Sequence, residues 1–139
     1  MTNLANKYRL IQILMIVSLF TSLAMSFEKQ TEFCGIESGC EIVENSMYSS
    51  TLGIKNYIFG IAVFAFLVYL TNSHINNPTK DKKHLLELSL IVGSIIAIYF
   101  LYLQEYVLFA YCKYCIIIDF SIIIATIIFY FFKDHNRQI

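Results

Sequence analysis

Cys112 and Cys115 form a C-x-x-C pair within Tyr111-Cys112-Lys113-Tyr114-Cys115, directly before an apolar run that ends at Phe132. Two thiols at this spacing can close into a small disulfide when the first turn of a helix begins between them. The positive end of the helix dipole and the ammonium of Lys113 both favour a thiolate, which is the reactive form of the side chain. The sequence therefore predicts a redox-capable pair where water meets the lipid core.

A second, wider pair consists of Cys34 and Cys40, with Gly35 and Gly39 inside the loop to ease its closure. Four cysteines allow three pairings, and the sequence alone does not choose among them. Two disulfide-capable pairs on one face could pass electrons by thiol–disulfide exchange. The alternatives are structural disulfides or a four-thiolate zinc site, although zinc sites usually show two close C-x-x-C-like knuckles.

The composition is that of a polytopic membrane protein, with 58% hydrophobic residues, only 14% charged residues and a net charge of zero. No basic patch suggests binding to a nucleic acid, so membrane lipid is the expected surrounding. We predict one membrane domain over residues 1–139.

Four apolar segments are about long enough to cross a bilayer as helices. We therefore expect an all-α integral membrane protein, a bundle of four transmembrane helices, with spans at residues 10–27, 54–70, 85–103 and 111–132. The first segment has a rival interpretation as a cleaved signal peptide with a small-residue site at Ala24-Met25-Ser26, but it is longer than a usual signal core.

The connections between these spans differ in character. Residues 71–84 read as a polar turn with a breaker at Asn76-Asn77-Pro78, and Gln104-Glu105 reads as a very short connection. Residues 28–53 form the predicted outer loop with Cys34 and Cys40. Within it Ile42, Val43 and Met47 recur at helical spacing, which predicts a short amphipathic helix at the membrane surface.

Basic residues predict the orientation of the chain. They gather at the N-terminus, in the Lys80–Lys83 cluster and at the C-terminus, whereas the loops that hold the cysteines are poor in Lys and Arg. We expect a multi-pass protein of the cell membrane with both termini in the cytoplasm and both cysteine pairs on the outer face. That compartment is oxidising and suits disulfides.

The chain resembles the vitamin K epoxide reductase family in its microbial branch. The resemblance rests on Cys34, Cys40, Val43, Ser46, Tyr48, on the stretch from Gly53-Ile54 through Asn56-Tyr57-Ile58-Phe59-Gly60, and on Cys112-Lys113-Tyr114-Cys115. In the other quinone-linked disulfide oxidases with four helices, the C-x-x-C pair precedes the wider pair. The opposite order here favours the vitamin K epoxide reductase family.

The resemblance implies a role for each cysteine. Cys34 would face a partner protein, Cys40 would relay, Cys112 would receive electrons, and Cys115 would reduce a quinone of the menaquinone or ubiquinone type. Many microbial members carry a fused thioredoxin-like domain. This chain has none, which implies a separate thioredoxin-fold disulfide carrier on the outer face.

The resemblance also implies residues near the quinone. Asn56 matches a position that hydrogen-bonds a quinone carbonyl, and Ser46 matches a polar loop position near the C-x-x-C pair. Tyr111 is a candidate either for the quinone pocket or for the aromatic belt at the membrane interface. No metal is expected in this reading.

Asp119 departs from the pattern, because vertebrate members carry a tyrosine four residues after the last cysteine. It lies one helical turn beyond Cys115 on roughly the same face. A carboxyl inside a span is a functional candidate, here for proton exchange with quinone or Cys115, and the competing interpretation is a solvated carboxyl at the interface. His74 and His84 are expected to be solvated, and Glu87 is expected to reach the interface.

The sequence therefore predicts a membrane thiol:quinone oxidoreductase that makes disulfides in exported proteins. One alternative is a quinone or vitamin K epoxide reductase whose product is the hydroquinone. The other alternative is a non-enzymatic membrane protein with structural disulfides or a four-thiolate metal site.

Overall fold

Four long helices make up almost all of the chain that the computed structural model describes, namely residues 2–27, 47, 50–109 and 113–132. Helix α1 spans Thr2–Phe27, α3 spans Asn56–Asn76, α4 spans Lys80–Tyr102 and α5 spans Lys113–Phe131. All four are long and apolar enough to cross a membrane. The predicted bundle of four membrane helices is therefore confirmed, whereas the predicted amphipathic helix in the outer loop falls almost wholly outside the described residues.

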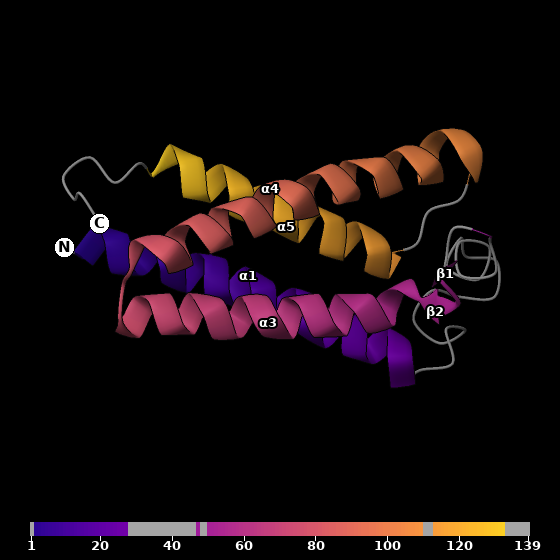
Figure 1. The fold of residues 1–139 in the computed structure, drawn as a ribbon. Coiled ribbons are helices and arrows are strands. Elements are labelled where there is room, and N and C mark those ends of the chain that lie inside the picture. Colours follow the sequence, from indigo (N-terminus) through magenta and orange to yellow (C-terminus); the bar gives the residue numbers. More distant parts are fainter. Residues whose placement is uncertain (1, 28–46, 48–49, 110–112, 133–139) are drawn as a thin grey trace.

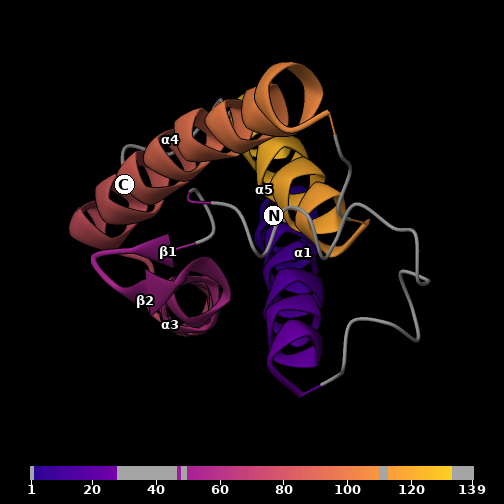
Figure 2. The ribbon, with the colours of Figure 1, turned by 90° about the vertical axis from the view of Figure 1, so that its right-hand side faces the viewer.

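The helices run antiparallel to their neighbours along the chain (Figure 1). α1 packs against both α3 and α5, α4 packs on α5, and α3 and α4 touch less (Figure 2). One end of the bundle holds the α3–α4 turn at Asn77–Thr79, and we call it the turn end. At the opposite end α1 stops while α3 and α5 begin, and we call it the cysteine end because Cys115 lies there.

Apolar side chains three or four residues apart on each helix form the core. Its buried members are Tyr8, Ile11, Met15, Phe64, Leu67, Leu70, Leu86, Leu90, Ala97, Ile122, Ala125 and Phe129. The outer faces are equally apolar, with Phe20, Tyr69 and Ile95 all exposed by more than 60%. A surface of this kind is stable against lipid tails, which supports the membrane assignment.

The α4–α5 interface combines a close approach with a hydroxyl contact. A Cβ atom on Gly93 would overlap Cδ1 of Ile122, so the glycine lets the two helices come together. The hydroxyls of Ser94 and Thr126 lie 2.7 Å apart across the same interface. Small residues and hydroxyl pairs are the usual means by which helices associate in lipid.

The helices extend further than the sequence pattern indicated. Residues Thr71–Asn76 continue α3 and Lys80–His84 begin α4, so the turn between them is only Asn77–Thr79. The predicted break at Asn76-Asn77-Pro78 is confirmed as the end of α3. Polar residues remain helical here because their groups find partners: the Thr71 hydroxyl donates to the Leu67 carbonyl oxygen at 2.7 Å.

Gln104 and Glu105 do not form a short connection, as the sequence had suggested. They belong to a π-helix, Leu103–Val107, that continues α4, and the Leu108 N–H donates to the Leu103 carbonyl oxygen at 2.8 Å. This i to i+5 bond widens the last turn of the helix. A hydropathy pattern based on 3.6 residues per turn does not reveal such a widening.

A small antiparallel hairpin leads into α3. Strand β1, Ser50–Thr51, pairs with β2, Ile54–Lys55, and the two residues between them, Leu52 and Gly53, have φ values of 55° and 83°. Positive φ at both central positions matches the right-handed twist of a two-residue hairpin. The hairpin thereby fixes the point at which α3 starts, directly at Asn56.

Candidate functional site

Cys115 lies in the first turn of α5, two residues after its start at Lys113. The side chain is half-buried and packs against Tyr114, which also contacts Ala24 and Met25 where α1 meets α5. The first N–H groups of a helix have no partner within it and carry the positive end of the dipole, so they favour a thiolate at this place. Cys34, Cys40 and Cys112 lie outside the described residues.

Asp119 is buried, with 6% of its surface exposed, one helical turn deeper than Cys115. The interpretation of Asp119 as a solvated carboxyl at the interface is therefore wrong. A carboxyl inside a membrane bundle is costly and usually has a function. The two side chains stand four residues apart on one helix, which places thiol and carboxyl on the same side of α5.

Two contacts fix the antiparallel register of α1 and α3. The rings of Tyr8 and His74 lie 4.6 Å apart near the turn end, and Ser22 meets Gly60 nearer the cysteine end. The two contacts are fourteen residues apart on α1 and also on α3, so they are consistent with a single register. On that register Asn56 lies one turn beyond Gly60, close to the cysteine end.

The register of α1 and α5 follows from two further contacts. The Tyr8 and Phe129 rings lie 6.3 Å apart at the turn end, and Tyr114 packs against Ala24 and Met25 at the other end. Cys115 therefore lies near the depth of Ser22, and Asp119 near the depth of Ser18. Asn56 and Cys115 come to within about one helical turn of each other in depth, roughly 5 Å along the bundle axis.

The structure thus gathers part of the predicted site at one end of the bundle. Asn56, Cys115 and Asp119 lie at the cysteine end, on two different helices. Ser46 and Tyr111, the other two predicted quinone-site residues, lie outside the described residues. Among the described residues there is no group of three or more His, Cys, Asp and Glu that could hold a metal ion. The four-thiolate alternative remains untested, because three of its cysteines lie outside that set.

Sequence reasoning missed Gln104, whose side chain is almost completely buried in the π-helix. Tyr130 meets Glu87 and Thr126 meets Leu90, and the same α4–α5 register carries Gln104 to the depth of the start of α5. A buried amide in a π-helix beside the cysteine end is a candidate polar group of the site, since π-helical turns are frequent at functional sites. The signal in the sequence that could have identified Gln104 is its position as a polar amide inside an apolar run.

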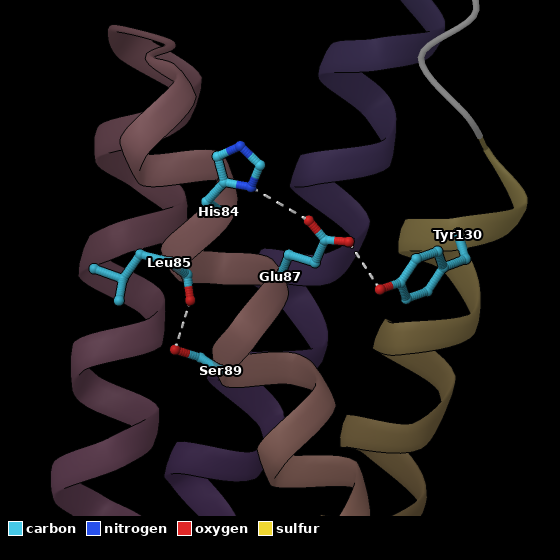
Figure 3. A network of polar contacts seen from close by, with 5 residues as sticks. All are labelled: His84, Leu85, Glu87, Ser89 and Tyr130. Carbon is cyan, nitrogen blue, oxygen red and sulfur yellow. Dashed lines mark hydrogen bonds and ion pairs between the residues drawn. The ribbon is translucent and has the colours of Figure 1, made fainter.

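The turn end is also more ordered than expected. His74 is 5% exposed and its ring packs against Tyr8, so the expectation that it is solvated is wrong. Glu87 accepts a hydrogen bond from the Tyr130 hydroxyl at 2.9 Å, and its other oxygen lies 3.7 Å from Nδ1 of His84 (Figure 3). His84 itself is exposed, in agreement with expectation.

Four membrane-length helices with a half-buried thiol and a buried carboxyl at one end define a polytopic membrane protein with a site suited to redox and proton chemistry. The family model of the Vitamin K epoxide reductase family matches residues 9–130, nearly the whole chain, and the protein belongs to that family. Neither a curated protein nor a solved structure matches the chain. Membership makes the protein a multi-pass membrane oxidoreductase of a family linked in general to quinones and thiols.

Proposed function

We propose that the protein is a thiol:quinone oxidoreductase that generates disulfide bonds in exported proteins. A thioredoxin-fold carrier on the outer face would deliver electrons to Cys34 and Cys40, which would pass them to Cys112 and Cys115. The observation that carries the proposal is the position of Cys115 in a family whose model covers residues 9–130: a thiol in the first turn of α5, half-buried, one turn above the buried Asp119.

Each exchange in this relay is balanced in atoms and electrons. One disulfide is reduced while two thiols of the donor become a disulfide, so two electrons and two protons move per cycle. At the last step the thiols of Cys112 and Cys115 become a disulfide, and a quinone takes up the two electrons and two protons as hydroquinone. The menaquinone or ubiquinone type would be the natural acceptor in a membrane.

The residues at the cysteine end fit a quinone as electron-accepting substrate. A quinone needs an apolar surrounding, hydrogen-bond donors for its carbonyl oxygens and a route for protons. α1 supplies an apolar wall at Ala24 and Met25, Asn56 supplies an amide at the start of α3, and the Asp119 carboxyl can give or take a proton one helical turn from Cys115. Ser46 and Tyr111 complete the proposed site.

The proposal is tested with purified protein, a reduced thioredoxin-fold dithiol and decylubiquinone, a quinone whose fully substituted ring does not add thiols. Absorbance follows quinone reduction and non-reducing gels follow oxidation of the dithiol. We expect one quinone reduced per disulfide formed. Reduction of an added quinone epoxide instead would support the epoxide reductase, and an absence of quinone-dependent oxidation would support a non-enzymatic protein.

The proposed orientation places the cysteine end outside and the turn end in the cytoplasm. After reduction of intact cells, a membrane-impermeant thiol reagent added from outside should label the cysteines that are accessible. An impermeant amine reagent should label Lys80, Lys82 and Lys83 only after the membrane is opened, because all three lie at the turn end. Labelling of these lysines from outside would overturn the orientation.

A further inference from the structure

Two serine hydroxyls lie inside the bundle with no hydrogen-bond partner among the described residues. Ser18 and Ser22 are both 0% exposed, and Oγ of each is fully buried and unpaired. They stand four residues apart and therefore share one face of α1. A buried hydroxyl without a partner is unfavourable, so this pair calls for an explanation.

The other helical hydroxyls show what a hydroxyl in a membrane helix does when nothing else is available. Five of them donate to the carbonyl oxygen four residues earlier, at 2.7–2.9 Å: Thr21, Thr71, Ser89, Ser121 and Thr126. This bond within the helix is the usual way to satisfy a hydroxyl away from water. Ser18 and Ser22 do not make it, so a polar group outside the described residues is needed to satisfy their hydroxyls.

The place of the two serines indicates which group that is. Ser22 lies near the depth of Cys115 and Ser18 near the depth of Asp119, as the α1–α5 contacts of Tyr8 and Tyr114 require. Gly60 of α3 faces Ser22, and a Cβ atom there would lie 3.0 Å from the Ser22 Oγ. The unpaired hydroxyls thus lie at the depths of the thiol and the carboxyl, on the side of the bundle toward the cysteine end.

We propose that Ser18 and Ser22 donate hydrogen bonds to a carbonyl oxygen of the quinone, at the end of its ring that lies deeper in the membrane. The inference rests on the proposed function and extends its site onto α1. Asn56 is one helical turn nearer the cysteine end than Gly60 and Ser22, a separation on the order of 6 Å along the axis. A quinone ring of about that width would place one carbonyl at the amide and the other at the serines.

A purely structural explanation competes with this one. Small residues let membrane helices approach closely, and Ser22 against Gly60 would serve that purpose without any ligand. The two explanations differ in what they predict for alanine, which preserves the small size and removes only the hydroxyl. A packing residue tolerates alanine without change in quinone binding, whereas a binding residue does not.

The experiment compares wild type with Ser18→Ala, Ser22→Ala and the double variant, each purified in detergent. Thr21→Val is the matched control, because the Thr21 hydroxyl is on the same helix but is already satisfied by the Val17 carbonyl oxygen. The thermal midpoint is measured without quinone and with increasing decylubiquinone, and the dissociation constant is taken from the shift. Quinone turnover is measured in parallel.

We expect the dissociation constant for decylubiquinone to rise roughly 3- to 10-fold in each single serine variant, and further in the double variant. The control should match wild type. Without quinone, the serine variants should be at least as stable as wild type, since an unsatisfied hydroxyl has been removed. This combination of unchanged or higher stability and weaker binding is not what a packing residue gives.

Two outcomes would overturn the inference. If wild type binds decylubiquinone and the double serine variant binds it equally well, the serines serve packing only and the proposed function stands. If wild type neither binds nor reduces decylubiquinone, the proposed function fails and this inference fails with it. Binding and reduction of decylubiquinone by wild type distinguish the two failures.

Gly60→Ala provides a second test that does not depend on deleting a hydroxyl. The added Cβ would lie 3.0 Å from the Ser22 Oγ but 3.7 Å from the Ser22 Cβ, which is ordinary contact. Gly60→Ala should therefore weaken quinone binding severalfold in wild type, by displacing the hydroxyl, and have little effect in a Ser22→Ala background. An equal loss in both backgrounds would show that Gly60 acts independently of the serine and would count against the inference.

Discussion

The two ends of the bundle both carry polar side chains, but these side chains differ in their contacts. At the turn end the Tyr130 hydroxyl donates to Glu87, and the Lys7 ammonium lies 4.6 Å from the centre of the Phe129 ring. At the cysteine end the hydroxyls of Ser18 and Ser22 are buried without partners among the described residues. At the turn end side chains of different helices contact one another, whereas the two serine hydroxyls toward the cysteine end have no such partner among the described residues.

This difference distinguishes polar side chains that stabilise the bundle from polar side chains that serve its function. Polar side chains that pair across helices hold a membrane bundle together, since lipid offers them no alternative partner. Polar side chains that are buried without such pairs lower stability and are retained for binding or chemistry. Substitutions at the cysteine end should therefore change activity at nearly constant stability, and substitutions at the turn end should do the reverse.

The largest effect is expected for Cys115→Ala. The thiol beside the quinone is removed, so quinone reduction should fall below detection, while the first exchange between the partner and Cys34–Cys40 continues. A single-turnover experiment with one equivalent of reduced partner measures both the first thiol exchange and the reduction of quinone. Cys115→Ser is the matched variant for size and polarity, and it should be as inactive as the alanine variant.

The direction of the relay can be read from the trapped species. Cys34→Ala leaves Cys40 without its resolving partner and should enrich a Cys40–Cys112 bond, detected by peptide mapping under non-reducing conditions. A trapped Cys34–Cys112 bond in the Cys40→Ala variant, with no Cys40–Cys112 bond in the first, would reverse the assigned roles. The lack of any bond between the pairs would favour two independent structural disulfides.

Asp119→Asn should have the next largest effect. The amide preserves size but cannot exchange a proton, and positioned acid–base groups typically contribute at least 10²-fold to a rate. We expect kcat for quinone reduction to fall roughly 100-fold while exchange with the partner is unchanged. The pH profiles of wild type and Asp119→Asn, measured for both reactions, give the comparison. Activity within a factor of two of wild type would remove Asp119 from the proton route.

Asn56→Ala should have a moderate effect that is confined to quinone affinity. A hydrogen bond to a quinone carbonyl is worth about 1 kcal/mol net and more in a dry site. The apparent Michaelis constant for quinone should therefore rise roughly 5- to 10-fold, since about 1.4 kcal/mol is a factor of ten. Partner exchange should not change. An unaltered dependence on quinone concentration would exclude Asn56 from the site.

Tyr130→Phe should have the smallest effect, and on stability alone. It removes the hydrogen bond to Glu87 at 2.9 Å, at an exposed position where such bonds contribute little. The free energy of unfolding in mixed detergent should fall only slightly, with quinone turnover unchanged. Ser89→Ala is the matched control, because that hydroxyl bonds only to the Leu85 carbonyl oxygen within its own helix. A loss of turnover in Tyr130→Phe would break the contrast between the two ends.

The sequence by itself determined the class of fold and the family. Long apolar runs must be helices in lipid, because only a helix satisfies its own backbone there. The break at Asn76-Asn77-Pro78 was predictable because Pro78 cannot continue the helix that precedes it. The spacing of Cys112 and Cys115 indicated a redox pair, and the family followed from the joint pattern of motifs.

Only the tertiary structure decided how each polar residue is used. Hydropathy assigned His74 to solvent because it averages along the chain, whereas the packing of Tyr8 from a helix more than sixty residues away buries it. The π-helix that carries Gln104 inward is likewise invisible to a helical period. In the sequence, Ser18 and Ser22 look like any other serines in an apolar run. They are set apart by the register of the helices, which brings them to the depths of Asp119 and Cys115. That register depends on contacts between distant segments, so no local pattern in the sequence contains it.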